Sequence, residues 1–417
     1  MFVFSGITIL ELVLYSVMSR RTFIKQSGLL AGAMFLEHNF TNAMPGNPEK
    51  IRLGIIGFGD RGAGIRGVIL QLPELFELTT VCDVLDIRLE RAKKYTGKQS
   101  VNIVKDYREV LSDKNIDAVI IATTLSEHFS IAKAALEAGK HVYLEKTMTY
   151  NKEQALELLS LVVKKHPRQI FQVGHQYRSS PLYYKVKEII QGGELGHVTQ
   201  IDCRWDRNGN WRRPVPSPEL ERSINWRMYK EYSGGLAAEL LSHQIDFINW
   251  VFDTHPDEIY ATGGIDFFKD GRETFDNLQA VLRYNKEGMI GNFGATCANQ
   301  KDGYLFKIKG SEGSVTLLMN EGFFYPEKKN KPLQTVDGVT GSTKIVLNKD
   351  GGMPILPEPT KDGTWYALKD FHTCITEGKM PESNIYTGTK TSVCVDLINQ
   401  SSYTSTIQKW KPEYNVG

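Results

Sequence analysis

The sequence has few features of a disulfide scaffold, a membrane protein or a nucleic-acid-binding protein. Its 417 residues include only five cysteines, an odd number without Cys-x-x-Cys spacing, which argues against a disulfide framework and against a cysteine-bound metal. The formal net charge is only +2, so no strong field exists to attract a polyanion. We find no internal repeat and no low-complexity tract. What remains is a soluble globular protein whose length suggests two domains.

The N-terminal residues have the features of an export signal. Residues 2–17 form an apolar run that Glu11 interrupts and that is too short for a convincing membrane span. The Ser-Arg-Arg-Thr-Phe-Ile-Lys segment at 19–25 and the mildly apolar stretch after it are typical of a twin-arginine leader, which exports folded proteins. We therefore predict a leader over residues 1–48 with Met18 as the true start. We also predict a periplasmic mature protein with no membrane association.

Residues 51–90 are typical of a dinucleotide-binding unit. Ile51–Ile56 suits a buried parallel strand, and Gly57, Gly59 and Gly62 follow it in the order Gly-x-Gly-x-x-Gly. The first glycine permits a tight turn and the second lets the backbone approach a pyrophosphate. The third lets the next helix pack closely, so that its N-terminal amides face the phosphates. The predicted cofactor-binding loop comprises Gly57, Phe58, Gly59, Asp60, Arg61 and Gly62.

An acidic residue completes this motif. Asp83 lies 21 residues after Gly62, at the end of a second strand-like run. A carboxylate there accepts hydrogen bonds from the ribose hydroxyls of NAD and repels the additional phosphate of NADP. We therefore predict NAD as the cofactor, although the neighbouring Arg88 and Arg91 leave NADP open at this stage.

An alternation of strand and helix patterns continues to residue 174. It predicts a doubly wound parallel sheet, a Rossmann domain of the α/β class, over residues 49–174. The strand-like runs are 116–122, 141–144 and 170–173, and the amphipathic helical segments are 130–138 and 151–165.

Residues 175–417 have a different texture, because strand-like stretches follow one another with few helices between them. They predict an α+β domain with a large open, mainly antiparallel sheet, whose exposed face would form a homodimer or homotetramer interface. Segments 367–378 and 389–407 are predicted helices that pack back on the first domain. The predicted strands are 197–205, 256–263, 277–284, 289–297, 304–309 and 314–319.

Four segments resemble the Gfo/Idh/MocA family of sugar and inositol oxidoreductases. They are the glycine loop, the Ala-Gly-Lys-His-Val-Tyr-Leu-Glu-Lys segment at 138–146, the segment from Gly234 to Asp246, and Gly-Ser-Glu-Gly at 310–313. The chain departs from the family's Glu-Lys-Pro motif by having Thr147, and from its Ala-Thr-Pro-Asn-x-x-His motif at 122–128. The resemblance implies that three further residues contact the cofactor: Thr123, His128 and Glu145.

The resemblance also implies the catalytic residues. In the family, the lysine at the position of Lys146 lies beside the nicotinamide and the reacting hydroxyl, where a cation polarises the developing carbonyl. Glu239 and His243 lie four residues apart on a helix predicted from Leu236 to Phe252, with Asp246 three residues further on the same face. Members commonly have Asp-x-x-x-His here. We assign His243 as the acid/base and Glu239 as a hydroxyl-binding partner.

Other interpretations of this helix stay open. Glu239 and His243 could bind a metal with His175 as a third ligand, but no other close ligand pair is present and the family requires no metal, so we predict none. A histidine inside a domain can also simply be a satisfied structural residue.

Aromatic and polar residues gather at 174–178, 205–213 and 225–227, between the predicted domains. Indole rings stack on the apolar face of a pyranose, while arginine and carboxylate groups bind its hydroxyls. The same composition suits a subunit interface, whereas the near-neutral charge argues against nucleic acid. We predict a small-molecule carbohydrate substrate bound by Tyr177, Arg178, Trp205, Trp211, Arg212, Trp226 and Asp246.

These features predict an NAD-dependent dehydrogenase that removes hydride from a secondary hydroxyl of a sugar or glycoside. The resemblance implies C3 of a hexopyranoside, which some relatives oxidise. Because the periplasm has no obvious NAD pool, an alternative is redox-neutral chemistry in which a retained cofactor is regenerated within each cycle. Such redox-neutral chemistry is carried out by a glycosidase similar to glycoside hydrolase family 109 or by a coupled sugar-pair oxidoreductase. A third hypothesis is a carbohydrate-binding or sensing protein with structural NAD, since a fold alone does not establish activity.

Overall fold

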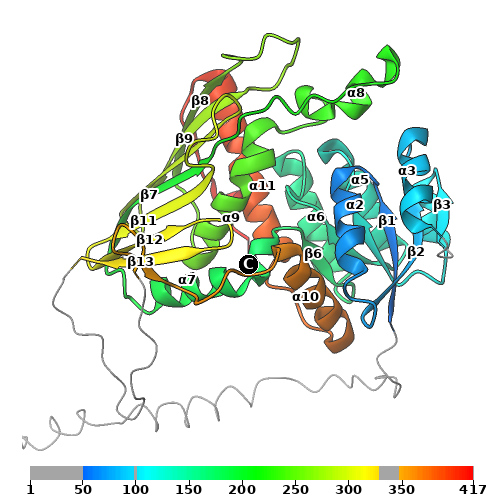
Figure 1. The fold of residues 1–417 in the computed structure, drawn as a ribbon, viewed down its shortest axis with the longest axis horizontal. Helices are drawn as coiled ribbons and strands as arrows, with labels where there is room; N and C mark the ends of the chain where they lie inside the picture. Colours follow the sequence, from blue (N-terminus) through cyan, green and yellow to red (C-terminus); the bar gives the residue numbers. More distant parts are fainter. Residues whose placement is uncertain (1–49, 98–100, 328–346, 417) are drawn as a thin grey trace, which may run out of the picture. The chain divides into compact units, whose positions relative to one another are not determined.

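Six parallel strands form the first of two sheets in the computed structural model, which describes residues 50–97, 101–327 and 347–416 (Figure 1). Their order is β3-β2-β1-β4-β5-β6, which confirms the predicted doubly wound sheet. The strands are β1 (Ile51–Ile56), β2 (Phe76–Cys82), β3 (Asn102–Val104), β4 (Ala118–Ile121), β5 (His141–Leu144) and β6 (Phe171–Val173). The intervening helices are α2 (Asp60–Ile69), α3 (Asp86–Thr96), α4 (Tyr107–Ser112), η1 (Leu125–Glu127), α5 (His128–Glu137) and α6 (Lys152–Lys165).

Helices cover both faces of this sheet, which explains why its strands are almost continuously apolar. One core cluster contains side chains of α2, α3 and α10 (Gly363–Glu377), and the other contains side chains of α4, α5 and α6. Along β1, Leu53 and Ile55 belong to the first cluster and Ile56 to the second, as the alternation of a strand requires. The strand order reverses beside β1, and ligands bind at such a switch point.

The second sheet has nine strands in the order β14-β13-β12-β11-β7-β10-β9-β8-β15 (Figure 1). Its neighbouring strands are antiparallel except β7 and β10, which confirms the predicted open, mainly antiparallel sheet. The strands are β7 (Val198–Trp205), β8 (Glu258–Gly264), β9 (Asn277–Tyr284), β10 (Met289–Thr296), β11 (Tyr304–Gly310), β12 (Gly313–Leu317), β13 (Gly322–Pro326), β14 (Met353–Pro354) and β15 (Gln408–Lys409).

One face of the second sheet packs against helices. Side chains of α7, α9 and α11 share a single apolar core with its strands. α11 also touches the first domain, because Lys152 of α6 forms an ion pair with Asp396 at 3.0 Å. The helical segments of this part are η2 (Gln176–Ser179), α7 (Pro181–Gln191), η3 (Pro218–Leu220), α8 (Glu221–Ile224), η4 (Trp226–Met228), η5 (Ala237–Leu241), α9 (Ser242–Val251), α11 (Ile385–Thr404) and η6 (Pro412–Tyr414).

The prediction of one regular helix from Leu236 to Phe252 was wrong in its first turn. Residues 237–241 form a π-helical turn, η5, and the α-helix α9 begins only at Ser242. The wider turn presents backbone carbonyl groups to other donors, since the oxygen of Ala238 accepts hydrogen bonds from the hydroxyls of Thr147 at 3.0 Å and Ser242 at 2.7 Å. Such turns are frequent at functional sites.

The predicted leader, residues 1–48 with Met18, lies outside the described residues. In the part of the chain that the structure covers, no helix combines the length and the apolar character needed to span a membrane.

Candidate active site

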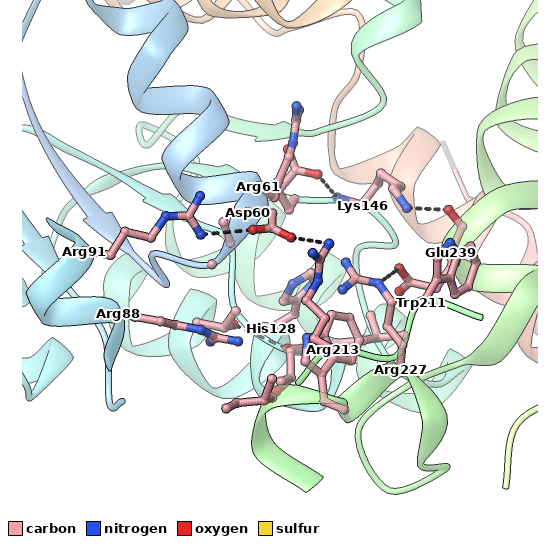
Figure 2. Close-up of a pocket in the computed structure, with 18 of the residues that line it drawn as sticks. Asp60, Arg61, Arg88, Arg91, His128, Lys146, Trp211, Arg213, Arg227 and Glu239 are labelled. Carbon is pink, nitrogen blue, oxygen red and sulfur yellow. Dashed lines mark hydrogen bonds and ion pairs between the residues drawn. The ribbon is translucent and has the colours of Figure 1, made fainter. Parts of the chain in front are cut away.

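A cavity of about 980 Å³ opens at the carboxyl ends of β1, β4 and β5 and is closed on the other side by residues of the second domain. Its volume is at the upper end of the usual range for ligand sites. Figure 2 shows how its polar side chains converge. Of the predicted site residues, twelve line it: Gly59, Asp60, Arg61, Thr123, His128, Glu145, Lys146, Trp205, Trp211, Trp226, Glu239 and His243.

The glycine loop has the geometry that a pyrophosphate requires. Gly57 has a φ of 92°, and a Cβ atom on it would lie 2.5 Å from the carbonyl oxygen of Ala122. A Cβ atom on Gly62 would lie 2.0 Å from the carbonyl oxygen of Gly57, so only glycine lets α2 pack here. α2 begins after Gly59 without a side-chain cap, which leaves its first amide groups available to an anion. The loop therefore fits the dinucleotide predicted for it.

Asp83 lies beneath the cavity and does not line it. Its buried carboxylate accepts hydrogen bonds from the backbone amides of Phe58 at 2.7 Å and Leu85 at 3.0 Å, and the guanidinium of Arg88 is 3.5 Å away. The side chain thus holds the glycine loop against the end of β2. Its contact with a ribose stays a prediction.

Three ion pairs connect the glycine loop to its surroundings (Figure 2). Asp60 contacts Arg91 of α3 at 3.0 Å and also contacts Arg213 of the second domain at 2.6 Å. Arg61 bonds the carboxylate of Glu145 at 2.7 Å. The loop is therefore linked both to its own domain and to the segment that closes the cavity.

Lys146 follows β5 and is half-buried beside the π-helical turn. Its Nζ donates a hydrogen bond to the backbone oxygen of Glu239 at 2.8 Å. Burial lowers the pKa of Lys146, and the charges of Arg227 and Arg61 lower it further, while Glu239 and Glu145 oppose the shift. Such a lysine releases and takes up a proton more readily than a solvated one.

The backbone after Lys146 is held from two sides. The Lys146–Thr147 peptide bond is cis, although the residue is not the proline found in the family motif. The carbonyl oxygen of Thr147 lies 2.9 Å from Nδ1 of His128, and the hydroxyl of Thr147 bonds the π-helical turn. Thr147 thus links β5 to the second domain through its hydroxyl group.

Glu239 and His243 lie together in the cavity with different charges. The carboxylate of Glu239 is 2.6 Å from Nε of Arg227. Burial raises the pKa of Glu239, but Arg227 and Lys146 together outweigh it, and the net shift is downward. Burial also lowers the pKa of His243 well below its usual value, and Lys146 adds to that effect. The site therefore combines an ionised acid with a neutral imidazole, which is able to accept a proton.

Arg178 and Asp246 lie outside the cavity and form a buried ion pair. Nε and Nη2 of Arg178 donate to the two carboxylate oxygens of Asp246 at 2.6 and 2.9 Å. This corrects the prediction that Asp246 shares the cavity-facing side of the helix with Glu239 and His243. A buried charge must be paired, and here the two predicted sugar-binding residues pair with each other.

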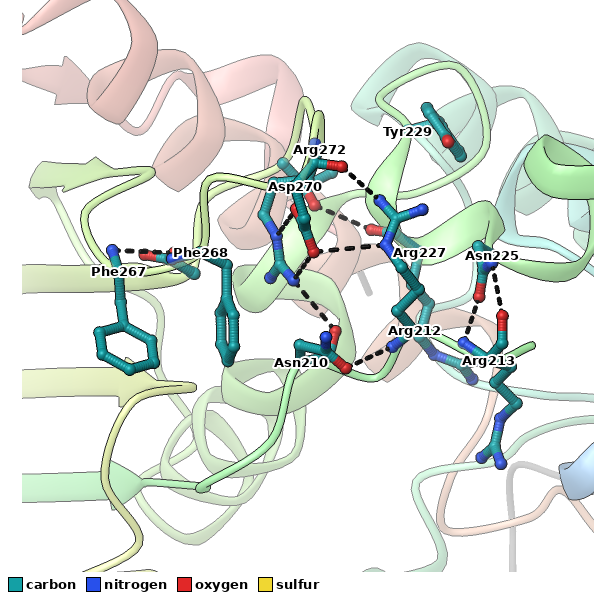
Figure 3. A network of polar contacts seen from close by, with 12 residues as sticks. Asn210, Arg212, Arg213, Asn225, Arg227, Tyr229, Phe267, Phe268, Asp270 and Arg272 are labelled. Carbon is teal, nitrogen blue, oxygen red and sulfur yellow. Dashed lines mark hydrogen bonds and ion pairs between the residues drawn. The ribbon is translucent and has the colours of Figure 1, made fainter. Parts of the chain in front are cut away.

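Arg212 also lies outside the cavity, where it anchors a loop (Figure 3). It donates from Nε to the carboxylate of Asp270 at 3.3 Å and from Nη2 to the carbonyl oxygen of that residue at 3.0 Å. Arg272 bonds the same carboxylate and the carbonyl oxygen of Asn210. These contacts fix the segment that carries Trp211.

Tyr177 stacks on Tyr183, with their ring centroids 4.8 Å apart. The ring centroid of Tyr177 also lies 5.1 Å from that of His243.

Several residues that line the cavity were not among the predicted site residues. Arg227 is the most important, because it fixes the charge of Glu239, and Arg207 and Arg213 enter from the segment 205–213. All three lie in the aromatic and basic stretches noted in the sequence. The aromatic and basic composition of these stretches indicated that they contribute to the site. The spacing of the residues did not indicate which side chain each arginine contacts.

Curated relatives share part of the chain. The "Uncharacterized oxidoreductase YrbE" of Bacillus subtilis is 30% identical over 218 residues, which are 52% of this chain and 58% of the relative. "Myo-inositol 2-dehydrogenase" of Thermotoga maritima is 27% identical over 247 residues, 58% of this chain and 67% of the relative. A solved structure, "Levoglucosan dehydrogenase, complex with NADH and levoglucosan", superposes with a TM-score of 0.70 at 20% identity, covering 87% of this chain and 99% of that one. It shows that the fold is shared.

Two family models match consecutive parts of the sequence. Residues 51–175 match "Oxidoreductase family, NAD-binding Rossmann fold", and residues 183–316 match "GFO/IDH/MocA C-terminal domain". The first match contains the strands of the parallel sheet, and the second contains strands β7 to β11 of the other sheet. Because they concern the two halves of one architecture and together span more than half of the 417 residues, the chain belongs to the Gfo/Idh/MocA family of oxidoreductases and has its NAD-binding Rossmann domain.

Proposed function

We propose that the protein oxidises a secondary hydroxyl of a sugar or glycoside, with NAD as hydride acceptor. The observation that carries the proposal is the meeting of Lys146, Glu239 and His243 in one cavity with the glycine loop. Of the proteins compared above, one relative is a myo-inositol 2-dehydrogenase, and the protein with the shared fold is a levoglucosan dehydrogenase in complex with NADH and levoglucosan. Both compounds present secondary hydroxyl groups.

NAD, when bound, supplies the acceptor for the hydride. The glycine loop and the first amides of α2 would hold its pyrophosphate. Lys146 donates a hydrogen bond to the substrate oxygen and stabilises negative charge as the carbonyl develops. His243, neutral and buried, takes the hydroxyl proton. Glu239, ionised by Arg227, accepts hydrogen bonds from a neighbouring hydroxyl.

Three indoles support a carbohydrate substrate. Trp205, Trp211 and Trp226 all line the cavity, and indole faces pack on the apolar face of a pyranose. C3 of a hexopyranoside is the position we propose for oxidation. It has hydroxyl neighbours on both sides that Glu239 and the cavity arginines are able to bind.

The test begins with the full chain purified without added cofactor. Bound NAD is identified by mass and absorbance, and a panel of sugars, cyclitols and glycosides is then screened for NADH formation. Lys146→Met should lower the rate of hydride transfer roughly 10²- to 10⁴-fold with little change in NAD affinity. The matched control Lys164→Met, at an exposed position near the end of α6, should keep full activity. Equal loss in both variants, or no NADH from any compound, would refute the proposal.

The same assay separates the alternatives. Steady NADH formation with an intact keto-sugar indicates a dehydrogenase. A single stoichiometric turnover with release of an aglycone indicates a redox-neutral glycosidase, and dependence on a second sugar indicates a coupled oxidoreductase. Sugar binding without any hydride transfer indicates a sensing protein.

We propose further that the mature protein is periplasmic and forms a homodimer or homotetramer through its second sheet. Supporting the second point, Tyr260, Val281 and Ile290 lie on neighbouring strands β8, β9 and β10, and each is more than 40% exposed. Apolar side chains in such a position favour burial against another copy. Sedimentation of the wild type and of a Val281→Lys variant tests the interface. Fractionation of the native host tests the location.

A further inference from the structure

A second cavity, of about 460 Å³, lies beside the active site. It opens where β7 ends and β11 begins, and the cross-strand neighbours Trp205 and Tyr304 both line it. Trp205, Arg207 and Trp211 also line the larger cavity, so the two cavities adjoin along the segment 205–211. The three catalytic residues line only the larger cavity. The second cavity therefore has no part in the proposed hydride transfer, although its volume is within the usual range for small-molecule sites.

The polar side chains of the second cavity are suited to hydroxyl groups. Asp206 supplies a carboxylate, which accepts hydrogen bonds, and Arg207 supplies a guanidinium, which only donates them. Asn208 and Gln300 supply exposed amide groups, which do both. Within the described part of the chain, these two amides and the guanidinium have no hydrogen-bond partner. A phosphate or carboxylate ligand would be repelled by Asp206, so the mixture favours a neutral ligand rich in hydroxyl groups.

Aromatic rings form the apolar part of the same lining. The ring centroids of Trp205 and Tyr304 lie 4.7 Å apart, with the planes at 88°. The guanidinium carbon of Arg207 lies 5.7 Å from the ring centroid of Trp205 and 5.5 Å from that of Trp211. Arg207 is therefore positioned by two indoles where the cavities adjoin. A pyranose has an apolar face and hydroxyl groups around its rim, so these rings and polar groups together fit a sugar.

The backbone of Trp211 is strained. Its φ is 61°, a left-handed value that bulky residues rarely adopt. Arg212 donates from its backbone amide to the side chain of Asn210 at 3.0 Å, and Arg272 donates to the backbone oxygen of Asn210 at 3.2 Å (Figure 3). The segment so held brings the indole to both cavities. Because strained residues cluster at ligand clamps, this conformation supports a ligand that reaches from one cavity into the other.

We propose that the substrate is a glycoside with at least two sugar rings and that its second ring binds in the second cavity. The inference rests on the proposed function and deepens it, because it names the substrate class. The ring that is oxidised lies in the larger cavity, and Arg207 binds hydroxyl groups near the glycosidic bond. The second ring packs against Trp211 and hydrogen-bonds to Asn208 and Gln300. A monosaccharide lacks the contacts of the second ring and therefore binds more weakly.

The first test measures sugar binding by calorimetry to the full chain loaded with NADH, which holds an alcohol without oxidising it. Maltose is compared with methyl α-glucoside, cellobiose with methyl β-glucoside, and lactose with methyl β-galactoside. Each methyl glycoside keeps the anomeric configuration but lacks the second ring. At least one disaccharide should bind roughly tenfold more tightly, as two or three added contacts predict. If no disaccharide binds more tightly than its methyl glycoside, or if a p-nitrophenyl glycoside gains as much, the proposal is overturned.

A second test fills the second cavity from one position. Gly209 lines only this cavity, and a Cβ atom on it would meet no atom within 4 Å. Gly209→Phe should therefore remove the roughly tenfold gain of the disaccharide over its methyl glycoside. Gly67→Phe, at a position in α2 where a Cβ atom also meets nothing, is the matched control and should keep the gain. A gain that persists in Gly209→Phe would contradict the proposal.

A double variant keeps the question decidable if Gly209→Phe does not fold. Asn208→Ala combined with Gln300→Ala removes two exposed amides without adding bulk, and it should reduce the gain at least roughly threefold. An unchanged gain would show that the second ring lies elsewhere.

Binding and turnover separate this inference from the proposed reaction. If a disaccharide binds with the expected gain and Gly209→Phe removes it, but no NADH forms, the second-ring site stands and the proposed oxidation fails. If NADH forms from a disaccharide and its methyl glycoside with equal kcat/KM, the oxidation stands and the second-ring site is wrong.

Discussion

The free energy of unfolding should fall in mild acid because the folded protein disfavours the protonated form of His175. The pKa of His175 is lowered from 6.5 to about 4, mainly by burial and in smaller part by Arg178 and Lys146, while Asp246 and Glu145 oppose the shift. Above pH 6.5 the residue is neutral in both states. Between pH 6.5 and about pH 4, His175 binds a proton in the unfolded chain but not in the folded protein, so the free energy of unfolding falls as pH falls. A shift of this size corresponds to about 3 kcal/mol.

The variant His175→Gln isolates this contribution, because glutamine does not titrate. We expect the difference in unfolding free energy between wild type and variant to decrease by about 1.4 kcal/mol per pH unit below 6.5, and to level off near a total of about 3 kcal/mol. Urea unfolding of the full chain, followed by circular dichroism from about pH 8 to about pH 4, measures it. His197→Gln, at an exposed histidine, is the control and should show a much smaller trend. A difference that stays constant over this range would refute the reasoning.

Three further predictions concern the loop, the buried ion pair and the cavity wall. Gly62→Ala should abolish cofactor retention and lower the melting temperature, whereas Gly64→Ala, which meets no atom within 4 Å, should retain NAD and gain about 0.5–1 kcal/mol. Arg178→Met should cost about 3–5 kcal/mol in urea unfolding by leaving a buried carboxylate unpaired, and adding Asp246→Leu should recover part of the loss. Failure to recover any would contradict the pairing argument. Trp211→Ala should raise KM for the oxidised sugar up to about tenfold through lost ring contact, with NAD affinity unchanged by calorimetry.

The sequence predicted the fold well wherever strands are apolar and long. The strands β1 and β9 have the predicted bounds, because the apolar and β-branched residues that form them are followed by clear turn residues. The strands β13, β14 and β15 were missed. They are short strands at or next to the edges of the second sheet, and few of their side chains are buried, so their sequences carry little periodic signal. The π-helical turn was also missed, since its residues have the same apolar spacing as a regular helix.

The prediction of the site was accurate where a motif fixes the backbone. It was less accurate for side chains whose partners depend on the packing of the helices. Lys146, Glu239 and His243 meet in the cavity because they lie at the ends of elements that the fold brings together. Arg178 and Asp246 have the residue types of a sugar site, yet they bind each other. Residue types state which contacts are possible. Only the packing of η2 against α9 decides which of these contacts forms.

The nucleotide-binding domain contains a part that the ribosome makes last. Leu368 and Phe371 of α10 are fully buried in the same core cluster as β1 and α2, and Gln172 of β6 bonds the carbonyl oxygen of Ala367 at 2.8 Å. At ordinary synthesis speeds roughly 10–40 s separate the appearance of β6 from that of α10. During that time one face of the first sheet lacks the part of its cover that α10 supplies. The chain therefore gains its ability to hold a dinucleotide only when translation is almost complete, and a truncation before residue 363 should yield a protein that cannot retain one.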